Sequence, residues 1–259
     1  ACEAGKHVLA DKPFASASAV EQMIAACSGH QLMDATHFMH SPRLVALKDA
    51  IHTAGPLQRV AASFSTSLVP RDRFTQNIRS DVSLEPYGAL GDLGWYTIRA
   101  ALWAFDWQLP EEVGCIAHDY RAGAITDVSG WASWRQGRVA NFDASFLAAR
   151  RQTLELVGTN ASVRVDDFVL SSHPHAAWEV RWLKPVRRGE HFDTDILVQR
   201  YSVQGARPEV SMVQRMASIA RSGALEPQWP HYTMLTTRVL EACVQALGKR
   251  RVVSLGKEP

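Results

Sequence analysis

The chain has 259 residues, of which 46% are hydrophobic, 21% charged and 8% aromatic, and its formal net charge is +2. A chain of this length buries about 70–75% of its unfolded surface, as one large domain or two small ones. The small net charge, with no basic run longer than Lys249-Arg250-Arg251, argues against a nucleic-acid partner. No apolar run reaches the roughly 18 residues of a membrane span.

The first 55 residues alternate between strand and helix patterns. We expect strands over 6–10 and 31–36, a helix from a cap at Ser16 or Ser18 to Gly29, and a second helix over 42–53. Pro13 stops the first strand, and Gly55-Pro56 breaks the second helix. Strands that alternate with helices predict part of a doubly wound, Rossmann-like domain over residues 1–55.

The pattern changes after residue 55, and residues 56–259 predict a second, α+β domain. A strand over 58–67, a polar loop over 70–86 and an apolar helix over 90–105 come first. Further strands are expected over 112–117, 128–134, 139–147, 153–157, 162–165, 178–183 and 195–201, and helices over 209–222 and 232–248. Consecutive strands without helices between them imply an open, mainly antiparallel sheet with helices on one face. We expect the C-terminal helices to pack back on the first domain.

The four cysteines are far apart in the sequence and form no C-x-x-C motif. They are Cys2, Cys27, Cys115 and Cys243. We interpret them as reduced thiols in a reducing compartment, in preference to disulfides or a zinc site, and expect a cytoplasmic protein. Because the chain begins within an apparent fold, we expect an upstream segment to be missing, and an organellar targeting peptide stays open.

Two segments about eighty residues apart carry the chemistry. Asp11-Lys12-Pro13 ends the first strand, and ligands bind at the carboxyl ends of parallel strands. Gly88-Ala89-Leu90-Gly91-Asp92-Leu93-Gly94-Trp95-Tyr96 begins the predicted apolar helix. Asp92 and Tyr96 share one face of that helix because they are four residues apart. A tyrosine near a lysine ammonium can exchange a proton, and we expect the cation to lower the pKa of Tyr96.

Together these segments resemble the glucose–fructose oxidoreductase, inositol dehydrogenase and dimeric dihydrodiol dehydrogenase family (Gfo/Idh/MocA). The resemblance covers essentially the whole chain, and the run from Gly88 to Ala100 looks most like plant-type members. It implies NAD(P)-dependent hydride transfer at a carbinol or carbonyl carbon of a sugar-like, cyclitol or trans-dihydrodiol substrate. It also implies a homodimer or larger assembly through the open sheet.

The resemblance also assigns roles to residues of this chain. It implies that Lys12, Asp92 and Tyr96 are catalytic and that Asp11, Lys12 and Pro13 bind the cofactor. It implies a substrate cleft shaped by His37, His40, Trp95 and Arg99. His37, His40 and Asp34 are also close enough in sequence for a metal site, but the family needs no metal and we expect none.

Three departures from the family pattern affect these expectations. Asp11 replaces the usual glutamate. Arg99 occupies a position at which family members with histidine in place of Tyr96 have a substrate-binding aspartate. No G-x-G-x-x-G motif occurs, so the residues that cradle the cofactor pyrophosphate are not in the chain. The choice between NADP and NAD, which is made in that part of the fold, stays open.

Two alternative functions remain open at this point. In the first, the protein is a relative without cofactor or catalysis that acts as a structural or interaction subunit through its open sheet. In the second, the tryptophans of the strands bind carbohydrate, although packing on a sheet or dimer face is the more usual role of such residues. These tryptophans are Trp131, Trp134, Trp178 and Trp182.

Overall fold

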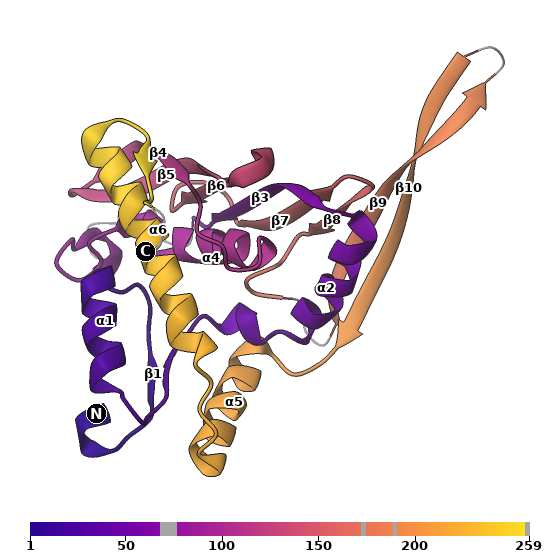
Figure 1. Cartoon of the computed structure of the whole chain (residues 1–259). Coiled ribbons are helices and arrows are strands. Elements are labelled where there is room, and N and C mark those ends of the chain that lie inside the picture. Colours follow the sequence, from indigo (N-terminus) through magenta and orange to yellow (C-terminus); the bar gives the residue numbers. More distant parts are fainter. Residues whose placement is uncertain (68–76, 172–174, 189–190, 257–259) are drawn as a thin grey trace.

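The computed structural model describes residues 1–67, 77–171, 175–188 and 191–256. In this part of the chain a two-stranded sheet, β1-β2, stands beside a nine-stranded sheet. The order of strands in the large sheet is β10-β9-β8-β7-β3-β6-β5-β4-β11. Figure 1 shows the small sheet and α1 at one end of the molecule and the β9–β10 hairpin projecting from the other.

The N-terminal residues form the strand–helix–strand–helix unit that the sequence predicts. β1 (Val8–Ala10) and β2 (Leu32–Asp34) are parallel, and α1 (Ala17–Ala26) connects them. Of the two candidate caps, Ser16 holds the start of α1, since its side chain accepts a hydrogen bond from the backbone N–H of Ala19. α2 (Pro42–Ala54) follows, with Pro42 in its first turn.

Two of the four cysteines are joined in a disulfide, so the prediction of four reduced thiols is wrong. Cys2 lies in a short 3-10 turn before β1, and Cys27 caps the C-terminal end of α1. The helix runs back along β1, which brings the two Cα atoms within 4.8 Å across 25 residues of sequence. Cys115 and Cys243 are free and buried. The inference of a reducing compartment rested on four free thiols and loses its basis.

The large sheet is mixed but mainly antiparallel, as predicted. Its strands are β3 (Leu57–Ser65), β4 (Glu112–Arg121), β5 (Ala124–Ser133), β6 (Val139–Ser145), β7 (Arg151–Gly158), β8 (Ala161–Val165), β9 (His175–Arg188), β10 (His191–Gln204) and β11 (Val253–Ser254). Among the pairings of these strands within the described residues, only β3 with β6 is parallel. The β9–β10 hairpin is longer than the two predicted strands.

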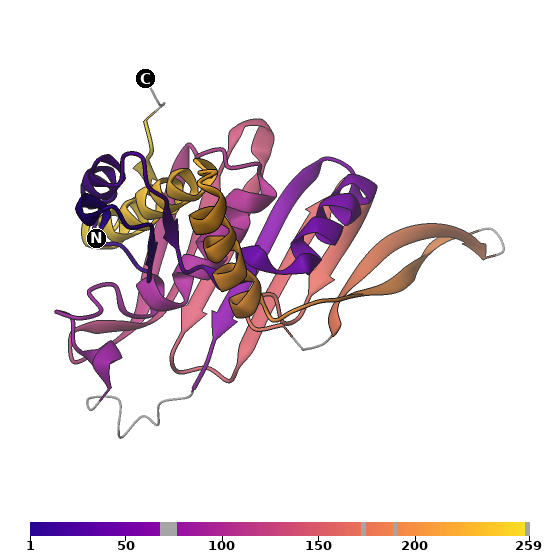
Figure 2. The same cartoon turned by 90° about the horizontal axis from the view of Figure 1, so that it is seen from below.

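One face of the large sheet is buried under helices. Along β7 and β8 every second side chain is buried, including Leu154, Leu156 and Val163, which is the alternation of a sheet with one covered face. Figure 2 shows the helices in front of that face, seen from below. The fold class predicted from the sequence is therefore confirmed.

The apolar helix predicted over 90–105 is two helices that meet at Leu93. They are α3 (Gly88–Asp92) and α4 (Gly94–Ala104), and all residues of α4 are buried. Gly88 begins α3 with a φ of 52°, and an added Cβ there would lie 2.2 Å from the carbonyl oxygen of Ile125 on β5. Glycine is therefore required at Gly88 for its backbone conformation and for the close approach of β5. The predicted loop over 70–86 lies partly outside the described residues and includes a 3-10 turn, Ile78–Ser80.

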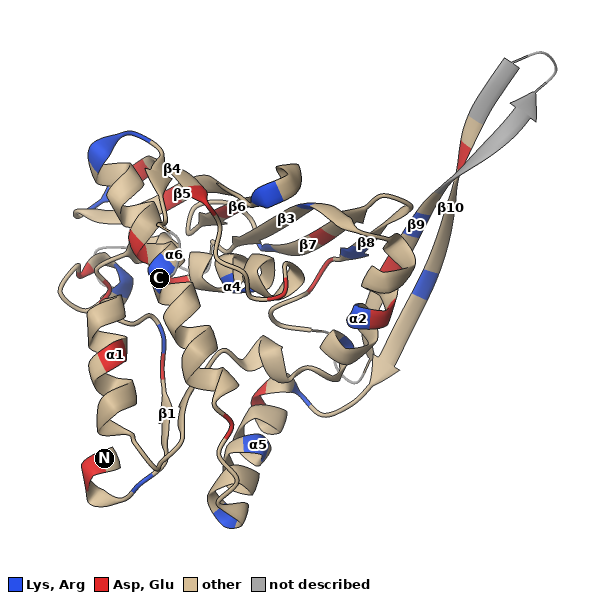
Figure 3. Cartoon of the chain, in the orientation of Figure 1, with Lys and Arg blue, Asp and Glu red and all other residues tan. Residues whose placement is uncertain are grey.

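The chain ends with α5 (Pro208–Ser222) and α6 (Gln228–Lys249), which begin close to the positions that the sequence predicts. α6 packs against α1, β2, α4 and β4, so it contacts both sheets. Charged residues of both signs are scattered over the elements (Figure 3). Among the helices of the described residues, none has the length and apolar character needed to cross a membrane.

Candidate active site

Lys12 lies directly after β1 and points at the junction of α3 and α4. Its Nζ donates hydrogen bonds to the Asp92 carboxylate oxygen Oδ1 at 2.6 Å and to the Asp92 backbone carbonyl at 2.7 Å. The Lys12 side chain is only 8% exposed. The two predicted catalytic segments, eighty residues apart in sequence, thus meet through a buried ion pair.

Asp92 is held by two cations. Its second carboxylate oxygen, Oδ2, accepts a hydrogen bond of 2.6 Å from Nε of Arg79. Burial acts to raise the pKa of Asp92, but the charges and hydrogen bonds of Lys12 and Arg79 outweigh it and hold the pKa below its usual range. Asp92 is therefore ionised at neutral pH. Sequence reasoning missed Arg79, because it lies in a polar loop with no motif around it.

Tyr96 follows Asp92 by one helical turn, and the Lys12 ammonium lies 5.0 Å from the centre of its ring. Burial raises the pKa of the Tyr96 phenol well above its usual value, and the negative charge of Asp92 raises it further. The prediction that Lys12 lowers this pKa is wrong, because the charge of Lys12 is paired with Asp92. Tyr96 consequently keeps its proton at neutral pH.

A pocket of about 230 Å³ opens beside these residues. Asp92, Arg79, Tyr96 and His37 supply most of its polar lining. The other lining residues are Thr66, Phe64, Leu93, Phe146, Val169 and Leu170. At about 30 Å³ for each water in the liquid, the pocket has the volume of roughly seven or eight waters, which suits a small substrate.

The two predicted histidines lie in different places. His37 lines the pocket, with its ring 5.5 Å from that of Tyr96, and burial lowers its pKa. His40 is not among the lining residues; it stacks on Trp229 at 4.4 Å, and burial lowers its pKa to about 4. Within the described residues, no group of His, Cys, Asp or Glu side chains has the arrangement of a metal site.

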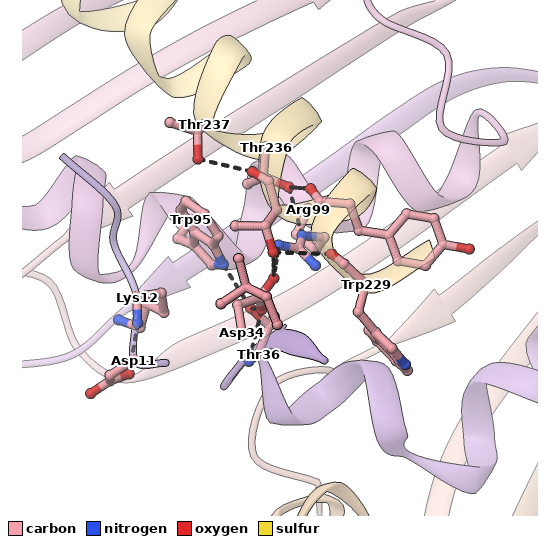
Figure 4. A network of polar contacts seen from close by, with 12 residues as sticks. Asp11, Lys12, Asp34, Thr36, Trp95, Arg99, Trp229, Thr236 and Thr237 are labelled. Atoms are coloured by element: carbon pink, nitrogen blue, oxygen red, sulfur yellow. Dashed lines mark hydrogen bonds and ion pairs between the residues drawn. The ribbon is translucent and has the colours of Figure 1, made fainter. Parts of the chain in front are cut away.

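Trp95 and Arg99 lie in the core, outside the lining of the pocket. Both side chains are fully buried. Arg99 forms an ion pair of 2.7 Å with Asp34 and donates from Nε to the Thr236 hydroxyl, as Figure 4 shows. Trp95 donates its indole N–H to the Thr36 hydroxyl. The location of these residues does not support the expected contact with substrate.

Asp34, which the sequence suggested only as a metal ligand, is the centre of that network. It accepts hydrogen bonds from the hydroxyls of Thr36 and Thr233 in addition to its ion pair with Arg99. Burial acts to raise the pKa of Asp34, yet Arg99 and the hydroxyls hold it below the usual value. The network joins the end of β2 to α4 and α6. The feature of the sequence that could have indicated it is the single carboxylate, Asp34, in an otherwise apolar strand.

The remaining predicted residues flank Lys12. The carboxylate of Asp11 is exposed and accepts a hydrogen bond of 2.8 Å from the backbone N–H of Lys12. Pro13 packs close to Gly91, where an added Cβ would lie 3.1 Å from the Pro13 ring and 2.7 Å from a carboxyl oxygen of Glu85. None of Asp11, Lys12 and Pro13 lines the pocket; Lys12 reaches its wall only through Asp92.

Comparison with known proteins finds similar sequences. Residues 46–164 match the family model described as the GFO/IDH/MocA C-terminal domain. The chain is 28% identical over 170 residues to a trans-1,2-dihydrobenzene-1,2-diol dehydrogenase of Sus scrofa, which covers 63% of this chain and 49% of that protein. It is 36% identical over 110 residues to an NADP(+)-dependent scyllo-inositol 2-dehydrogenase of Bacillus subtilis, covering 39% of this chain and 32% of that one. The chain thus spans about half or less of these curated relatives.

Solved structures show the same fold. A 3-ketoreductase from Actinomadura kijaniata, crystallised with NADP and TDP-benzene, superposes with a TM-score of 0.81 at 21% identity, over 95% of this chain and 72% of that one. A levoglucosan dehydrogenase in complex with NADH and levoglucosan superposes with a TM-score of 0.77 at 16% identity, over 99% of this chain and 75% of that one. At such identities the likeness establishes the fold alone.

Proposed function

We propose that the whole protein is an NAD(P)-dependent oxidoreductase of the GFO/IDH/MocA family, whose C-terminal domain model matches residues 46–164 of this chain. Its substrate would be a sugar-like molecule, a cyclitol or a trans-dihydrodiol. The observation that carries the proposal is that Asp92, paired with Lys12, and the buried Tyr96 line one pocket.

The arrangement suits proton transfer to a carbonyl oxygen. Tyr96 keeps its proton at neutral pH, so its hydroxyl is a proton donor to an oxygen that gains negative charge during reduction. Lys12 and Arg79 both bind Asp92, so the three side chains together carry one net positive charge, which would stabilise the charge on that oxygen. The nicotinamide cofactor, when bound, supplies or accepts the hydride.

The pocket favours a polar substrate. Two polar atoms of its lining are buried without a hydrogen-bond partner among the described residues: the hydroxyl of Thr66, and Nδ1 of His37, which lies 3.8 Å from a carboxylate oxygen of Glu209. Buried polar atoms without partners are costly, and the hydroxyl groups of a small polyol or sugar would satisfy them. The apolar walls would contact the carbon face of the same molecule.

The residues of this chain fit only the reacting end of the cofactor. Lys12, with Asp11 and Pro13 beside it, would lie at the nicotinamide, because these residues follow a parallel strand at its carboxyl end. The sequence holds no G-x-G-x-x-G, so none of its residues forms that pyrophosphate cradle. The proposal therefore concerns the full-length protein.

A cofactor titration with matched variants tests the proposal. The full-length protein is titrated with NADPH and NADH by nicotinamide fluorescence, and NAD(P)H oxidation is then followed with a panel of ketoses, inosose and vicinal diketones. We expect Tyr96→Phe to lower kcat by about 10²–10⁴-fold with cofactor binding intact, since a general acid contributes about that much. Tyr201→Phe, which changes a tyrosine on β10 away from the pocket, is the control.

Two outcomes would contradict the proposal. If the full-length protein binds neither nucleotide, the non-catalytic interaction subunit becomes the better interpretation. If Tyr96→Phe turns over at the rate of Tyr201→Phe, Tyr96 is not the proton donor. A homodimer through the open sheet remains a prediction, which light scattering of the full-length protein checks.

A further inference from the structure

A second and larger pocket, of about 530 Å³, lies at the edge of the large sheet. It is formed by β4 residues Gly114–Ala117, by Tyr120 and Trp131, and by the chain that leaves the end of α6. None of its lining residues lines the candidate active site. The pocket is therefore separate from the candidate active site.

The fold leaves this edge of the sheet open. β11 pairs with β4 only at Val253–Val113 and Ser254–Glu112, and the register of β4 with β5 uses its other edge. Beyond Val113 no strand of the described residues covers the outer edge of β4. The backbone groups of that edge are thus available to a ligand in the pocket.

The walls of the pocket are apolar and aromatic. Ile116 is 64% exposed, and Tyr120 and Val252 are about half exposed. Trp131 lies against Gly114, where an added Cβ would come within 2.4 Å of the indole ring, so glycine makes room for the ring on this face. Such walls suit a flat aromatic ring or an alkyl chain.

The polar part of the pocket is positive. Arg250 and Arg251 line it, both are exposed, and no Asp or Glu is among the described residues of its lining. The backbone of the two arginines is fixed by the end of α6: Arg250 has a φ of 49°, and the N–H groups of both donate to the last turn of the helix. Figure 3 shows this cationic turn at the end of α6.

We propose that this pocket binds an amphipathic organic anion. Its apolar body would lie against Trp131 and Ile116, and its carboxylate or phosphate would pair with Arg250 and Arg251. Arginine pairs with such groups through two parallel hydrogen bonds, and the volume is that of an ordinary small-molecule site.

A pair of fluorescent probes tests the site in the full chain. 8-Anilinonaphthalene-1-sulfonate carries the anion on an aromatic body, and N-phenyl-1-naphthylamine is its uncharged counterpart. We expect the sulfonate to bind with one-to-one stoichiometry. The double substitution Arg250→Gln/Arg251→Gln should raise the Kd of the sulfonate roughly tenfold or more, because a hydrogen bond to a charged group contributes about that much to affinity. The uncharged probe should bind the variant and the parent alike.

Two further variants locate the probe and control for charge. Ala117→Phe fills the pocket and should abolish binding of both probes, while Arg221→Gln removes an exposed arginine of α5 and should leave both unchanged. Circular dichroism confirms that each variant is folded. Displacement of the sulfonate by decanoate or decyl phosphate supports the proposal and distinguishes the two anionic groups.

The proposal is overturned by either of two results. One is displacement by neither amphiphile. The other is sulfonate binding that survives either Ala117→Phe or the double arginine substitution, because the probe would then occupy another surface or bind without the arginines.

Discussion

Replacement of Asp34 by asparagine is the sharpest test of the buried network. The side chains of Asp34 and Arg99 are 1% and 0% exposed, and their ion pair is 2.7 Å long. Asparagine keeps the shape but has a single acceptor oxygen, whereas Thr36 donates to Oδ1 of Asp34 and Thr233 donates to Oδ2. The substitution therefore removes the charge that compensates Arg99 and one of the two acceptors. Loss of one partner of a buried ion pair costs about 3–5 kcal/mol, and we expect the free energy of unfolding to fall by that amount.

Urea unfolding at pH 7, followed by circular dichroism and tryptophan fluorescence, measures the effect. Asp106→Asn is the matched control, because Asp106 pairs with Lys48 at 2.8 Å on the surface, with side chains 79% and 38% exposed. An exposed pair of this kind contributes less than about 1 kcal/mol. A loss below about 1 kcal/mol for Asp34→Asn, or an equal loss in both variants, would refute the reasoning.

The ion pair of Asp34 with Arg99 should also make the stability of the protein depend on pH in acid. The pKa of Asp34 is lower in the folded protein than in the unfolded chain, so its contribution to stability is complete above the ordinary carboxyl pKa of about 3.9. That contribution is lost as the pH falls through the lower pKa of the folded state. Stability of the parent chain should therefore decrease more steeply below about pH 4 than that of Asp34→Asn.

Two further predictions concern stability. Gly88→Ala should lower the free energy of unfolding by about 2 kcal/mol or more, because a φ of 52° is strained for alanine and the added Cβ would collide with the backbone of β5. Gly137 is the control: it has a φ of 72° but no atom within 4 Å of an added Cβ, so Gly137→Ala should cost only about 1 kcal/mol. Equal urea midpoints for the two variants would contradict this reasoning. Burial lowers the pKa of His40 to about 4; the facing charges of Asp34 and Glu226 act to raise it, and those of Arg215 and His37 act to lower it. The unfolded chain therefore takes up the proton first, and stability should fall as the pH decreases from about 6.5 to 4. His40→Gln should flatten that part of the pH profile, and an unchanged profile would show that His40 is not the group responsible.

The parts of the fold that could be predicted from the sequence are those determined by residues close to one another along the chain. Ser16 caps α1, Pro42 begins α2 and Gly55 ends it, and each signal acts within one turn of chain. The alternation of apolar residues similarly predicts the strands of the large sheet. The meeting of Lys12 with Asp92 was expected only through the family resemblance, since no local rule joins residues eighty positions apart.

Long-range pairs account for the parts that the sequence did not predict. The disulfide of Cys2 with Cys27 depends on the direction in which α1 returns along β1. Arg79 reaches Asp92 from a loop without a motif, and the partner of Arg99 lies 65 residues earlier in the chain. The pKa of Tyr96 was predicted in the wrong direction for the same reason, because the pairing of Lys12 with Asp92 removes the free cation on which the prediction rested.

α4 explains why Trp95 and Arg99 were grouped with the catalytic residues. Asp92 and Tyr96 are four residues apart, and so are Trp95 and Arg99. From spacing alone, the two residues of each pair are expected to share a helical face. On one continuous helix these two faces would differ by about 60° of rotation. In the structure Asp92 ends α3, while Trp95, Tyr96 and Arg99 belong to α4, all of which is buried. One face reaches Lys12 and the pocket, and the other holds Thr36 and Asp34. The ion pair of Arg99 therefore fixes the rotation of α4, and with it the direction in which Tyr96 faces the pocket.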